Sequence, residues 1–381
     1  MSASLATLLR EKHILVTCGA GGVGKTTTAA AISVAAAKAG RRVLCLTIDP
    51  AKRLAESLGL KEMRHEAMVV DPSRFAERGI PITGSLTAMM LDTKRTFDEL
   101  VEKYSSSPEK AQALLNNKLY RYMSTSLAGT QEYMAMEKLV AVKNDPAYDL
   151  IVLDTPPTAN ALDFLDAPER MVGALDSPAM KWLAEAFGSS GRFSMNILAK
   201  GAATVLKGIG KITGGGFLED MSQFVAQLQD LFGGFRERAV RVQNELRSPG
   251  VAFLLVTSPS PASIEEALFF SEKLREHRMP RGAFIVNRFR AASAQSPTEA
   301  DAHAAANALR EKRLPLDGAP ETRLLQAFAQ SAKLAEADAR SVARLAAEGV
   351  GTIVRVPEFA TDVHDLVLLD ALAQWLEVGG I

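Results

Sequence analysis

Short apolar runs alternate along the chain with longer stretches whose apolar residues recur at helical spacing. Each run has the length of a buried strand. The runs span 13–16, 43–48, 86–91, 149–154, 251–257, 283–287 and 352–356. Strands that are buried on both faces are apolar throughout, and helices connect parallel strands. The alternation therefore predicts an α/β fold with a doubly wound, mainly parallel sheet.

The first run leads into a glycine-rich loop and then into alanine-rich sequence of helical character. Residues 19–26 match G-x-x-x-x-G-K-[ST], a phosphate-binding loop at the start of a helix. Glycines let backbone N–H groups approach an anion, and the helix start adds positive dipole. Lys25 is expected to reach the β- and γ-phosphates of ATP, while the Thr26 hydroxyl holds Mg²⁺. The expected contacts of this loop are Gly21, Gly22, Val23, Gly24, Lys25, Thr26 and Thr27.

The same glycines also fit a second pattern. Gly19, Gly21 and Gly24 satisfy G-x-G-x-x-G, the dinucleotide-binding fingerprint, and Asp49 lies near its expected acidic position. The Lys25-Thr26 pair favours a nucleoside triphosphate, because a dinucleotide loop needs neither an ammonium nor a metal-binding hydroxyl there. We therefore expect a P-loop NTPase.

Two aspartates stand at the ends of predicted strands. Asp154 closes the run 149–154, where a carboxylate would help to position Mg²⁺ opposite Thr26. Asp49 follows the run 43–48 and could orient the attacking water beside the γ-phosphate. On position alone, each could also be a turn or helix-capping residue. The intact P-loop on a neighbouring strand favours the metal role for Asp154.

Composition removes some classes of function. The 44 basic and 44 acidic side chains leave no net field that would draw the chain to nucleic acid or anionic lipid. We find no apolar run of about 18 residues that predicts a membrane span, and residues 1–12 lack the apolar core of a signal peptide. A cytoplasmic protein is expected. Cys18 and Cys45 are expected to be small core residues, and the five histidines show no metal-ligand spacing.

Five motifs together resemble the ArsA family of deviant-P-loop ATPases, which includes the arsenite-pump ATPase and the ATPases that target tail-anchored membrane proteins. The resemblance spans nearly the whole chain and looks closest to the bacterial branch with a single P-loop. It implies one ATPase domain over 1–381. It also implies that the protein works as a homodimer or as a heterodimer with a paralogue. The motifs are Gly-Gly-Val-Gly-Lys-Thr-Thr at 21–27, Thr-Ile-Asp-Pro-Ala at 47–51, Ala-Gly-Thr-Gln-Glu at 128–132, Asp-Thr-Pro-Pro-Thr-Ala-Asn at 154–160 and Val-Asn-Arg at 286–288.

The resemblance also implies roles for particular residues. Asp49 would lie in switch I and orient the hydrolytic water, and residues 154–160 would form switch II. Asn287 would hydrogen-bond adenine. The loop around Pro357 and Glu358 would close over the base through its backbone.

The chain departs from the family pattern at three points. Ala20 stands where members usually carry a lysine that reaches the nucleotide of the other subunit. A cation supplied in this way is worth roughly 10³–10⁵ in rate. Its absence predicts slow hydrolysis, a substitute cation or a different subunit arrangement. The Cys-x-x-Cys pair that clamps zinc between protomers is missing, as are cysteines for an arsenite site, so arsenite binding is not expected.

Two regions are predicted to be helical: a segment beside the core, 94–143, and an insertion, 166–248. In the insertion, two apolar stripes at helical spacing flank the glycines at 214–216, which predicts two amphipathic helices joined by a flexible turn. The stripes could pack on the ATPase core or, as the resemblance implies, bind the apolar segment of a client protein. Helices at 297–312, 321–348 and 364–376 are expected to complete the chain.

The leading hypothesis is thus a Mg-ATP-hydrolysing switch whose nucleotide state moves a hydrophobic helical subdomain. A nucleotide-gated chaperone or assembly factor with little turnover is an alternative that Ala20 favours. An arsenite-pump subunit is a further alternative. A ParA-like DNA-partitioning ATPase is disfavoured by the zero net charge and the long apolar insertion.

Overall fold

The computed structural model describes residues 4–48, 53–60, 63, 65–126, 130–155, 161–178, 224, 234, 237–292, 298–311, 320–347, 349 and 351–378. At its centre lies one eight-stranded sheet of order β3-β4-β2-β5-β1-β6-β7-β8. The strands are β1 Ile14–Cys18, β2 Arg42–Thr47, β3 Met68–Val69, β4 Ser85–Met90, β5 Leu150–Asp154, β6 Val251–Thr257, β7 Arg281–Phe289 and β8 Thr352–Pro357. Every neighbouring pair is parallel except β3 with β4, so the predicted mainly parallel sheet is confirmed.

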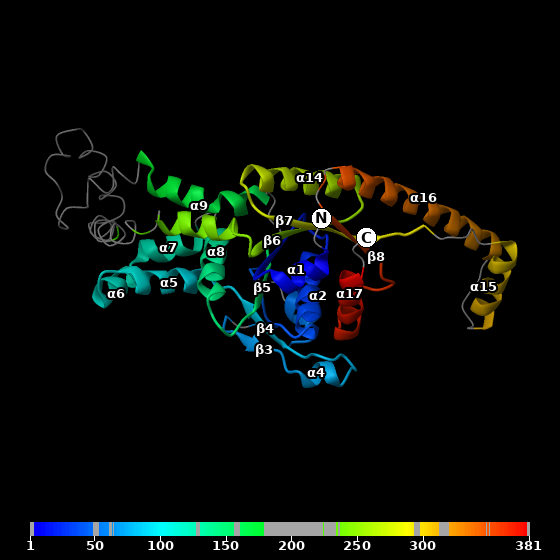
Figure 1. Cartoon of the computed structure of the whole chain (residues 1–381), viewed down its shortest axis with the longest axis horizontal. Helices are drawn as coiled ribbons and strands as arrows, with labels where there is room; N and C mark the ends of the chain where they lie inside the picture. The colour runs from blue at the N-terminus through cyan, green and yellow to red at the C-terminus, as the bar shows by residue number, and fades with distance from the viewer. Residues whose placement is uncertain are drawn as a thin grey trace.

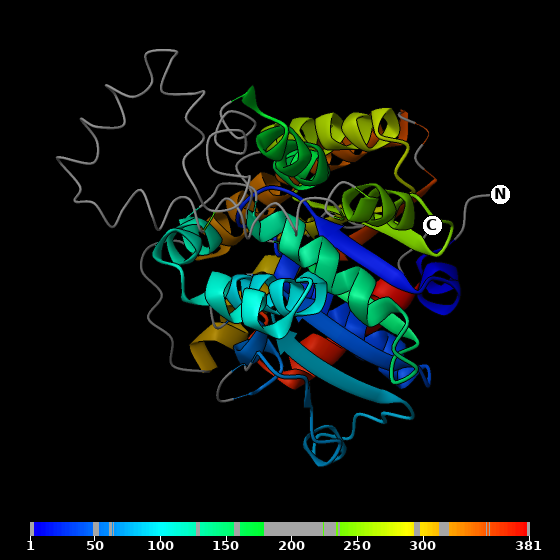
Figure 2. The ribbon, with the colours of Figure 1, turned by 90° about the vertical axis from the view of Figure 1, so that its left-hand side faces the viewer.

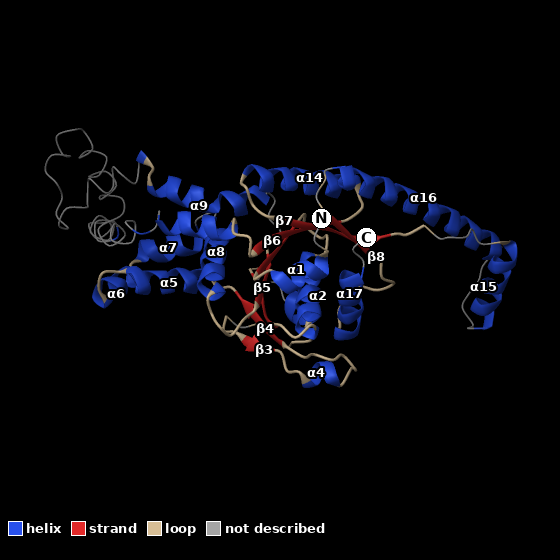
Figure 3. Ribbon diagram, in the orientation of Figure 1, coloured by secondary structure: helices blue, strands red, loops and turns tan. Residues whose placement is uncertain are grey.

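Helices cover both faces of the sheet, as Figure 3 shows with the strands in red between blue helices. The described helices are α1 Leu5–Glu11, α2 Lys25–Lys38, α3 Arg53–Ser57, α4 Ser73–Ala76, α5 Thr93–Tyr104, α6 Pro108–Asn116, α7 Lys118–Ser126, α8 Thr130–Lys143, α9 Ala161–Leu175, α14 Pro261–Glu276, α15 Glu299–Glu311, α16 Pro320–Ala347 and α17 Leu366–Val378. A further helix covers 237–246.

Successive residues of the central strands face two different cores, because side chains alternate across a strand. Leu15 packs in the core made with α1, α2 and α17, whereas Ile14 and Val16 pack in the core made with α8, α14 and α16. Helix α2 is alanine-rich, and eleven of its fourteen residues are buried. Small side chains let this helix lie close against the sheet, which fixes the position of the loop that precedes it.

Two helical parts extend away from the sheet on opposite sides (Figure 1). Helices α5–α8 lie at one side with a core of their own, in which Phe97 and Tyr120 have ring centroids 5.6 Å apart. Figure 2 shows this group of helices in front of the sheet. Helices α15 and α16 project at the other side. Of the described helices, none has both the length and the apolar character that crossing a membrane requires.

The structure refines the predicted elements in two places. Strand β3 was not predicted, because two residues at an antiparallel sheet edge leave no periodic signal. The segment 94–143 falls into four helices, since Ser107 caps α6 and Asn117 ends it, with the Asn117 side chain accepting a hydrogen bond from Leu119 N. The two amphipathic stripes of the predicted insertion 166–248 lie outside the described residues, with the exception of Phe224. Phe224 belongs to the core of the α5–α8 group.

Candidate active site

The predicted P-loop connects β1 to α2 at the middle of the sheet, where β1 lies between β5 and β6. Gly19 has φ +152, and a Cβ on it would lie 2.0 Å from the carbonyl oxygen of Val256. Gly24 has φ +95, and a Cβ there would lie 2.4 Å from Asn287 Nδ2. Both positions therefore require glycine, for backbone conformation and for space.

Lys25 is the first residue of α2 and is only 6% exposed. Its ammonium folds back over the loop and donates a hydrogen bond of 2.8 Å to the carbonyl oxygen of Ala20. The ammonium thus lies inside the curve of the loop rather than in solvent. Thr26 and Thr27 follow on the first turn of the helix and line the same cavity as Lys25.

Asp154 ends β5 and is fully buried. Its Oδ2 accepts a hydrogen bond of 3.0 Å from Thr47 Oγ1 at the end of β2. The next residue, Thr155, donates from its hydroxyl to the carbonyl oxygen of Thr17 on β1, at 2.7 Å. Hydrogen bonds between three adjacent strand ends therefore fix the orientation of the Asp154 carboxylate beside the P-loop.

Asn287 on β7 links the P-loop to the far side of the site. Its Nδ2 donates to the carbonyl oxygen of Val23 at 2.9 Å, and its Oδ1 accepts from Arg288 N at 3.0 Å. Strand β8 ends at Pro357, and Glu358 N donates to the carbonyl oxygen of Phe289 at 3.2 Å. The ends of β7 and β8 thus stand side by side, next to the loop.

These segments enclose a cavity of about 870 Å³. It is large enough for a nucleotide, since ligand pockets span about 300–1,000 Å³. The predicted residues that line it are Gly22, Gly24, Lys25, Thr26, Thr27, Asn287, Pro357 and Glu358. Gly21 and Val23 lie in the same loop, and Asp154 directly precedes Thr155, which lines the cavity. Asp49 and residues 156–160 lie outside the described residues.

Some residues of the cavity wall were not predicted. Glu56 and Ser57 of α3 line the cavity, and Gly59, which follows α3, lies next to Leu366 of α17. No local sequence pattern marks Glu56 or Ser57 as site residues. Arg288 and residues 359–364 also line it. Arg288 belongs to the Val-Asn-Arg motif, but no role was predicted for it, and the only signal of residues 359–364 is that they follow Glu358.

Both cysteines are buried core residues, as predicted. Burial raises the pKa of the Cys18 thiol to about 12, and it raises the pKa of the Cys45 thiol to about 12 as well. At neutral pH both groups are therefore protonated and poor ligands for soft metals or arsenite. Among the residues that the structure describes, no group of three or more His, Cys, Asp or Glu side chains could hold a metal ion.

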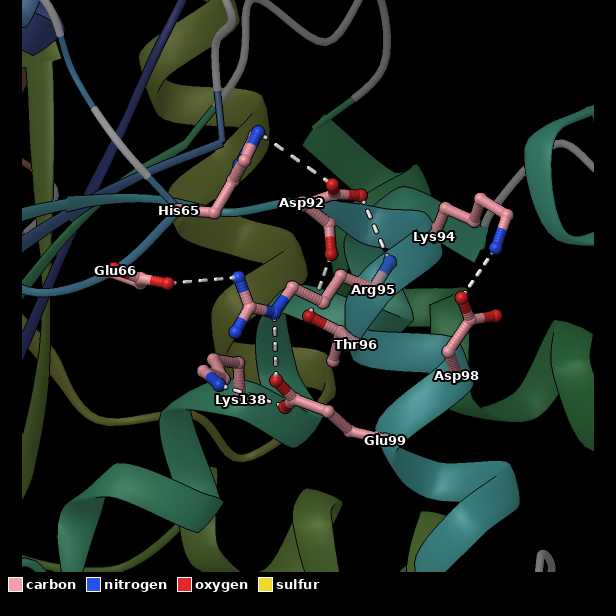
Figure 4. Close-up of polar contacts among 9 residues, drawn as sticks. All are labelled: His65, Glu66, Asp92, Lys94, Arg95, Thr96, Asp98, Glu99 and Lys138. Atoms are coloured by element: carbon pink, nitrogen blue, oxygen red, sulfur yellow. Dashed lines mark hydrogen bonds and ion pairs between the residues drawn. The ribbon is translucent and has the colours of Figure 1, made fainter. Parts of the chain in front are cut away.

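A polar network lies beyond the end of β4 (Figure 4). Asp92 caps α5 by accepting from Arg95 N at 3.0 Å, and His65 Nε2 lies 3.7 Å from the Asp92 carboxylate. Glu99 on α5 lies 3.6 Å from Arg95 Nε and pairs with Lys138 of α8 at 3.0 Å. This network connects the segment that follows α3 to the helices α5 and α8.

A glycine cradle at the centre of a parallel sheet, with a buried lysine and a strand-end aspartate beside it, defines an α/β P-loop NTPase. A family model described as anion-transporting ATPase matches residues 12–315, and the chain belongs to this family, the ArsA ATPases. The resemblance inferred from the motifs is thus confirmed, and the chain is an ATP-hydrolysing P-loop enzyme.

Similar proteins carry the name ATPase GET3. The chain is 25% identical over 291 residues to "ATPase get3" of Aspergillus terreus, covering 75% of this chain and 76% of the relative. It is 24% identical over 306 residues to "ATPase GET3" of Phaeosphaeria nodorum, covering 78% and 84%. A shorter match, 28% over 176 residues, is to "ATPase GET3" of Malassezia globosa, covering 45% and 48%.

Proposed function

We propose that this ATPase is a dimeric, Mg-ATP-driven switch whose nucleotide state controls the binding of an apolar protein segment by its helical part. The observation that carries the nucleotide role is the single cavity that brings Lys25, Asn287 and Pro357 together from three distant parts of the chain. Membership of the ArsA family supports the client role, because the resemblance implies that the helical region of such ATPases binds the apolar segment of a client protein.

The residues present fit a magnesium nucleotide. The positive φ angles of Gly22 and Gly24 turn the backbone of the loop as an anion cradle requires, and the Lys25 ammonium stands inside it. Thr26 and Asp154 are the oxygen donors that would hold Mg²⁺, which suits a hard cation. When bound, Mg²⁺ supplies positive charge to the β- and γ-phosphate oxygens.

In the proposed mechanism, Lys25 exchanges its hydrogen bond with Ala20 for the β- and γ-phosphate oxygens of ATP. Thr47 keeps the Asp154 carboxylate oriented throughout, because it bonds one oxygen from the neighbouring strand. Asp49 orients the attacking water. Asn287 and the backbone at Pro357 and Glu358 hold the adenine.

Nucleotide state would reach the helical part through the ends of β4 and β5. Strand β4 leads into α5 at Asp92, and β5 leads through 156–160 into α9. The ion pair between Glu99 of α5 and Lys138 of α8 joins these two helices, so that they can move together (Figure 4). Loss of the γ-phosphate would release the loops at Asp49 and 154–160 and shift this group.

Steady-state ATPase assays and calorimetry with Mg-ATP test the proposal. Lys25→Ala is expected to weaken both binding and turnover, whereas Asp49→Asn is expected to keep binding and lower turnover. Lys12→Ala is the matched control, because Lys12 precedes β1, at the amino-terminal ends of the parallel strands and opposite to the cavity, and donates to Pro249 O. Undiminished turnover in both site variants would contradict the proposed roles.

A second candidate is a nucleotide-gated binding protein with little turnover. The position that usually supplies a cation is Ala20, whose methyl group packs against the core beside α2. Capture of an immobilised apolar peptide should then differ between ATP, ADP and no nucleotide while hydrolysis stays slow. Equal capture in all three conditions would exclude gating.

A further inference from the structure

The backbone of Arg288 has an unusual conformation at the wall of the cavity. Its φ is +59, and among the described residues the other non-glycine with positive φ is Arg278, at +57. A left-handed backbone is costly for a residue with a Cβ, and such residues gather at functional sites. Glycine would adopt this conformation without strain, so the presence of arginine here indicates a role for its side chain.

Local hydrogen bonding holds Arg288 in this conformation. Asn287 Oδ1 accepts from the backbone N–H of Arg288 at 3.0 Å. The pairing of β7 with β8 shifts register between Val286 and Phe289, where β7 has one extra residue, as in a bulge. Bulges redirect side chains. Arg288 lies in this irregular part of β7 and lines the cavity.

Two neighbouring arginines have other partners. Arg290 donates from N, Nε and Nη2 to the buried carboxylate of Asp338, at 2.9 to 3.1 Å. The Arg355 guanidinium stands over the Phe289 ring, 5.6 Å from its centroid. The Arg288 guanidinium instead lies 3.9 Å from Asp362, whose side chain is 96% exposed, so this pair is weak and easily exchanged.

We propose that Arg288 stacks its guanidinium on the base of the bound nucleotide and so helps to set the affinity for nucleosides over bare phosphate chains. This inference rests on the proposed function of the cavity. The loop at 22–27 takes the phosphates, so the nucleoside must fill the part of the cavity that Asn287, Arg288 and the segment 357–364 enclose. A planar cation beside that volume suits a purine face.

Calorimetric titration with Mg-ATP and with Mg-tripolyphosphate separates a base contact from a phosphate contact. Arg288→Gly and Arg288→Ala are expected to raise the Kd for Mg-ATP about five- to thirtyfold, which corresponds to a cation–π contact of about 1–2 kcal/mol. The Kd for Mg-tripolyphosphate should stay within about twofold. Arg288→Lys, which keeps the charge but loses the plane, should remain several-fold weaker than the natural chain for Mg-ATP.

Glycine variants separate function from folding. Arg288→Gly removes the strained conformation, so its thermal midpoint should equal or exceed that of the natural chain. Arg278→Gly is the matched control, because Arg278 has the same backbone conformation but precedes β7, at the end of that strand opposite to Arg288. It should show the same thermal response with an unchanged Kd for Mg-ATP.

The outcomes distinguish the two proposals. A well-folded natural chain that fails to bind Mg-ATP would overturn the proposed function. Equal losses for Mg-ATP and Mg-tripolyphosphate would overturn stacking in favour of a phosphate contact. A loss in Asp362→Asn as large as that in Arg288→Ala would also overturn it, because the residue would then act by closing the cavity mouth through that pair.

Discussion

The cavity that we propose to bind the nucleotide is built differently at its two ends, the proposed phosphate end and the proposed nucleoside end. At the phosphate end, the wall is backbone, held by glycines with positive φ and by Lys25, which is 6% exposed. At the nucleoside end, the wall includes side chains from β7 and the segment after β8, and the Arg288 side chain is 55% exposed. A wall of backbone admits few substitutions, and it recognises a group common to all nucleoside triphosphates. A wall of side chains can vary, and it is the end that can discriminate between nucleosides.

Asn287 joins these two ends. It donates to Val23 in the loop and accepts from Arg288 beside it, so one side chain fixes the spacing between the phosphate and nucleoside ends. Changes at the phosphate end should therefore damage both folding and binding. Changes at the nucleoside end should mainly alter affinity.

The largest effect is expected at the phosphate end. Gly19→Ala would place a methyl group 2.0 Å from the backbone oxygen of Val256, so the loop and β6 must separate. We expect a loss of about 3–5 kcal/mol in the free energy of unfolding and no measurable Mg-ATP binding. Urea unfolding and calorimetry measure the two quantities. Gly21→Ala is the control for the unfolding measurement, since a Cβ there meets nothing within 4 Å, and an equal loss of stability in both variants would contradict the steric argument.

A smaller effect is expected behind the nucleoside end. Asp338→Ala removes the acceptor of three hydrogen bonds from Arg290, which adjoins the end of β7. Hydrogen bonds to charged groups contribute about 1.5–3 kcal/mol, so a loss of about 2 kcal/mol in the free energy of unfolding is expected. The double variant with Arg290→Ala should cost little more than Asp338→Ala alone. Additive losses would show that the two residues act independently.

Asn287→Asp tests the link between the two ends. The variant keeps an oxygen that can accept from Arg288 but loses the donor to Val23. We expect about 1 kcal/mol less stability and weaker Mg-ATP binding. Denaturant titration and calorimetry provide both numbers. If Asn287→Asp binds Mg-ATP as the natural chain does, the spacing does not depend on this bond.

The smallest effect is expected away from both ends of the cavity, at the amino-terminal ends of β2 and β5. Hydrogen bonds from the Arg42 side chain and backbone lower the pKa of Asp149 from its usual 3.8 to about 2. The folded state therefore favours the carboxylate, and the pair stabilises the protein at neutral pH and loses this contribution as pH falls from about 4 toward 2. Arg42→Ala should cost at most about 1 kcal/mol at pH 7, since the pair is largely exposed.

Thermal unfolding of Arg42→Ala across pH measures this loss. The difference from the natural chain should shrink as pH falls through that window, while the Kd for Mg-ATP at neutral pH stays unchanged. A difference that grows with acidity would contradict the assigned pKa direction.

The phosphate end could be predicted from the sequence because its physical demands are local. Gly19 and Gly24 stand where a side chain cannot fit, and Lys25 and Thr26 follow at fixed spacing, so eight consecutive residues specify the geometry. The strands other than β3 were predictable for a similar reason, since burial on both faces leaves continuous apolar runs such as 251–257.

The nucleoside end could not be predicted in this way. Asn287 and Pro357 were assigned from family resemblance, and Glu56 and Ser57 had no signal at all. These residues meet only because β7, β8 and α3 come together in the folded chain, and no spacing along the sequence encodes that. The same applies to Arg288, because its left-handed backbone depends on a register shift against β8.

The burial of both thiols has a practical consequence. The chain contains two cysteines, and each lies in the core with a pKa near 12, so neither should react with a maleimide dye at neutral pH. A cysteine placed at an exposed site on α5 or α16 would then be the one that takes the label. Distances between dyes on those helices could be followed by energy transfer, with every native residue of the core left in place.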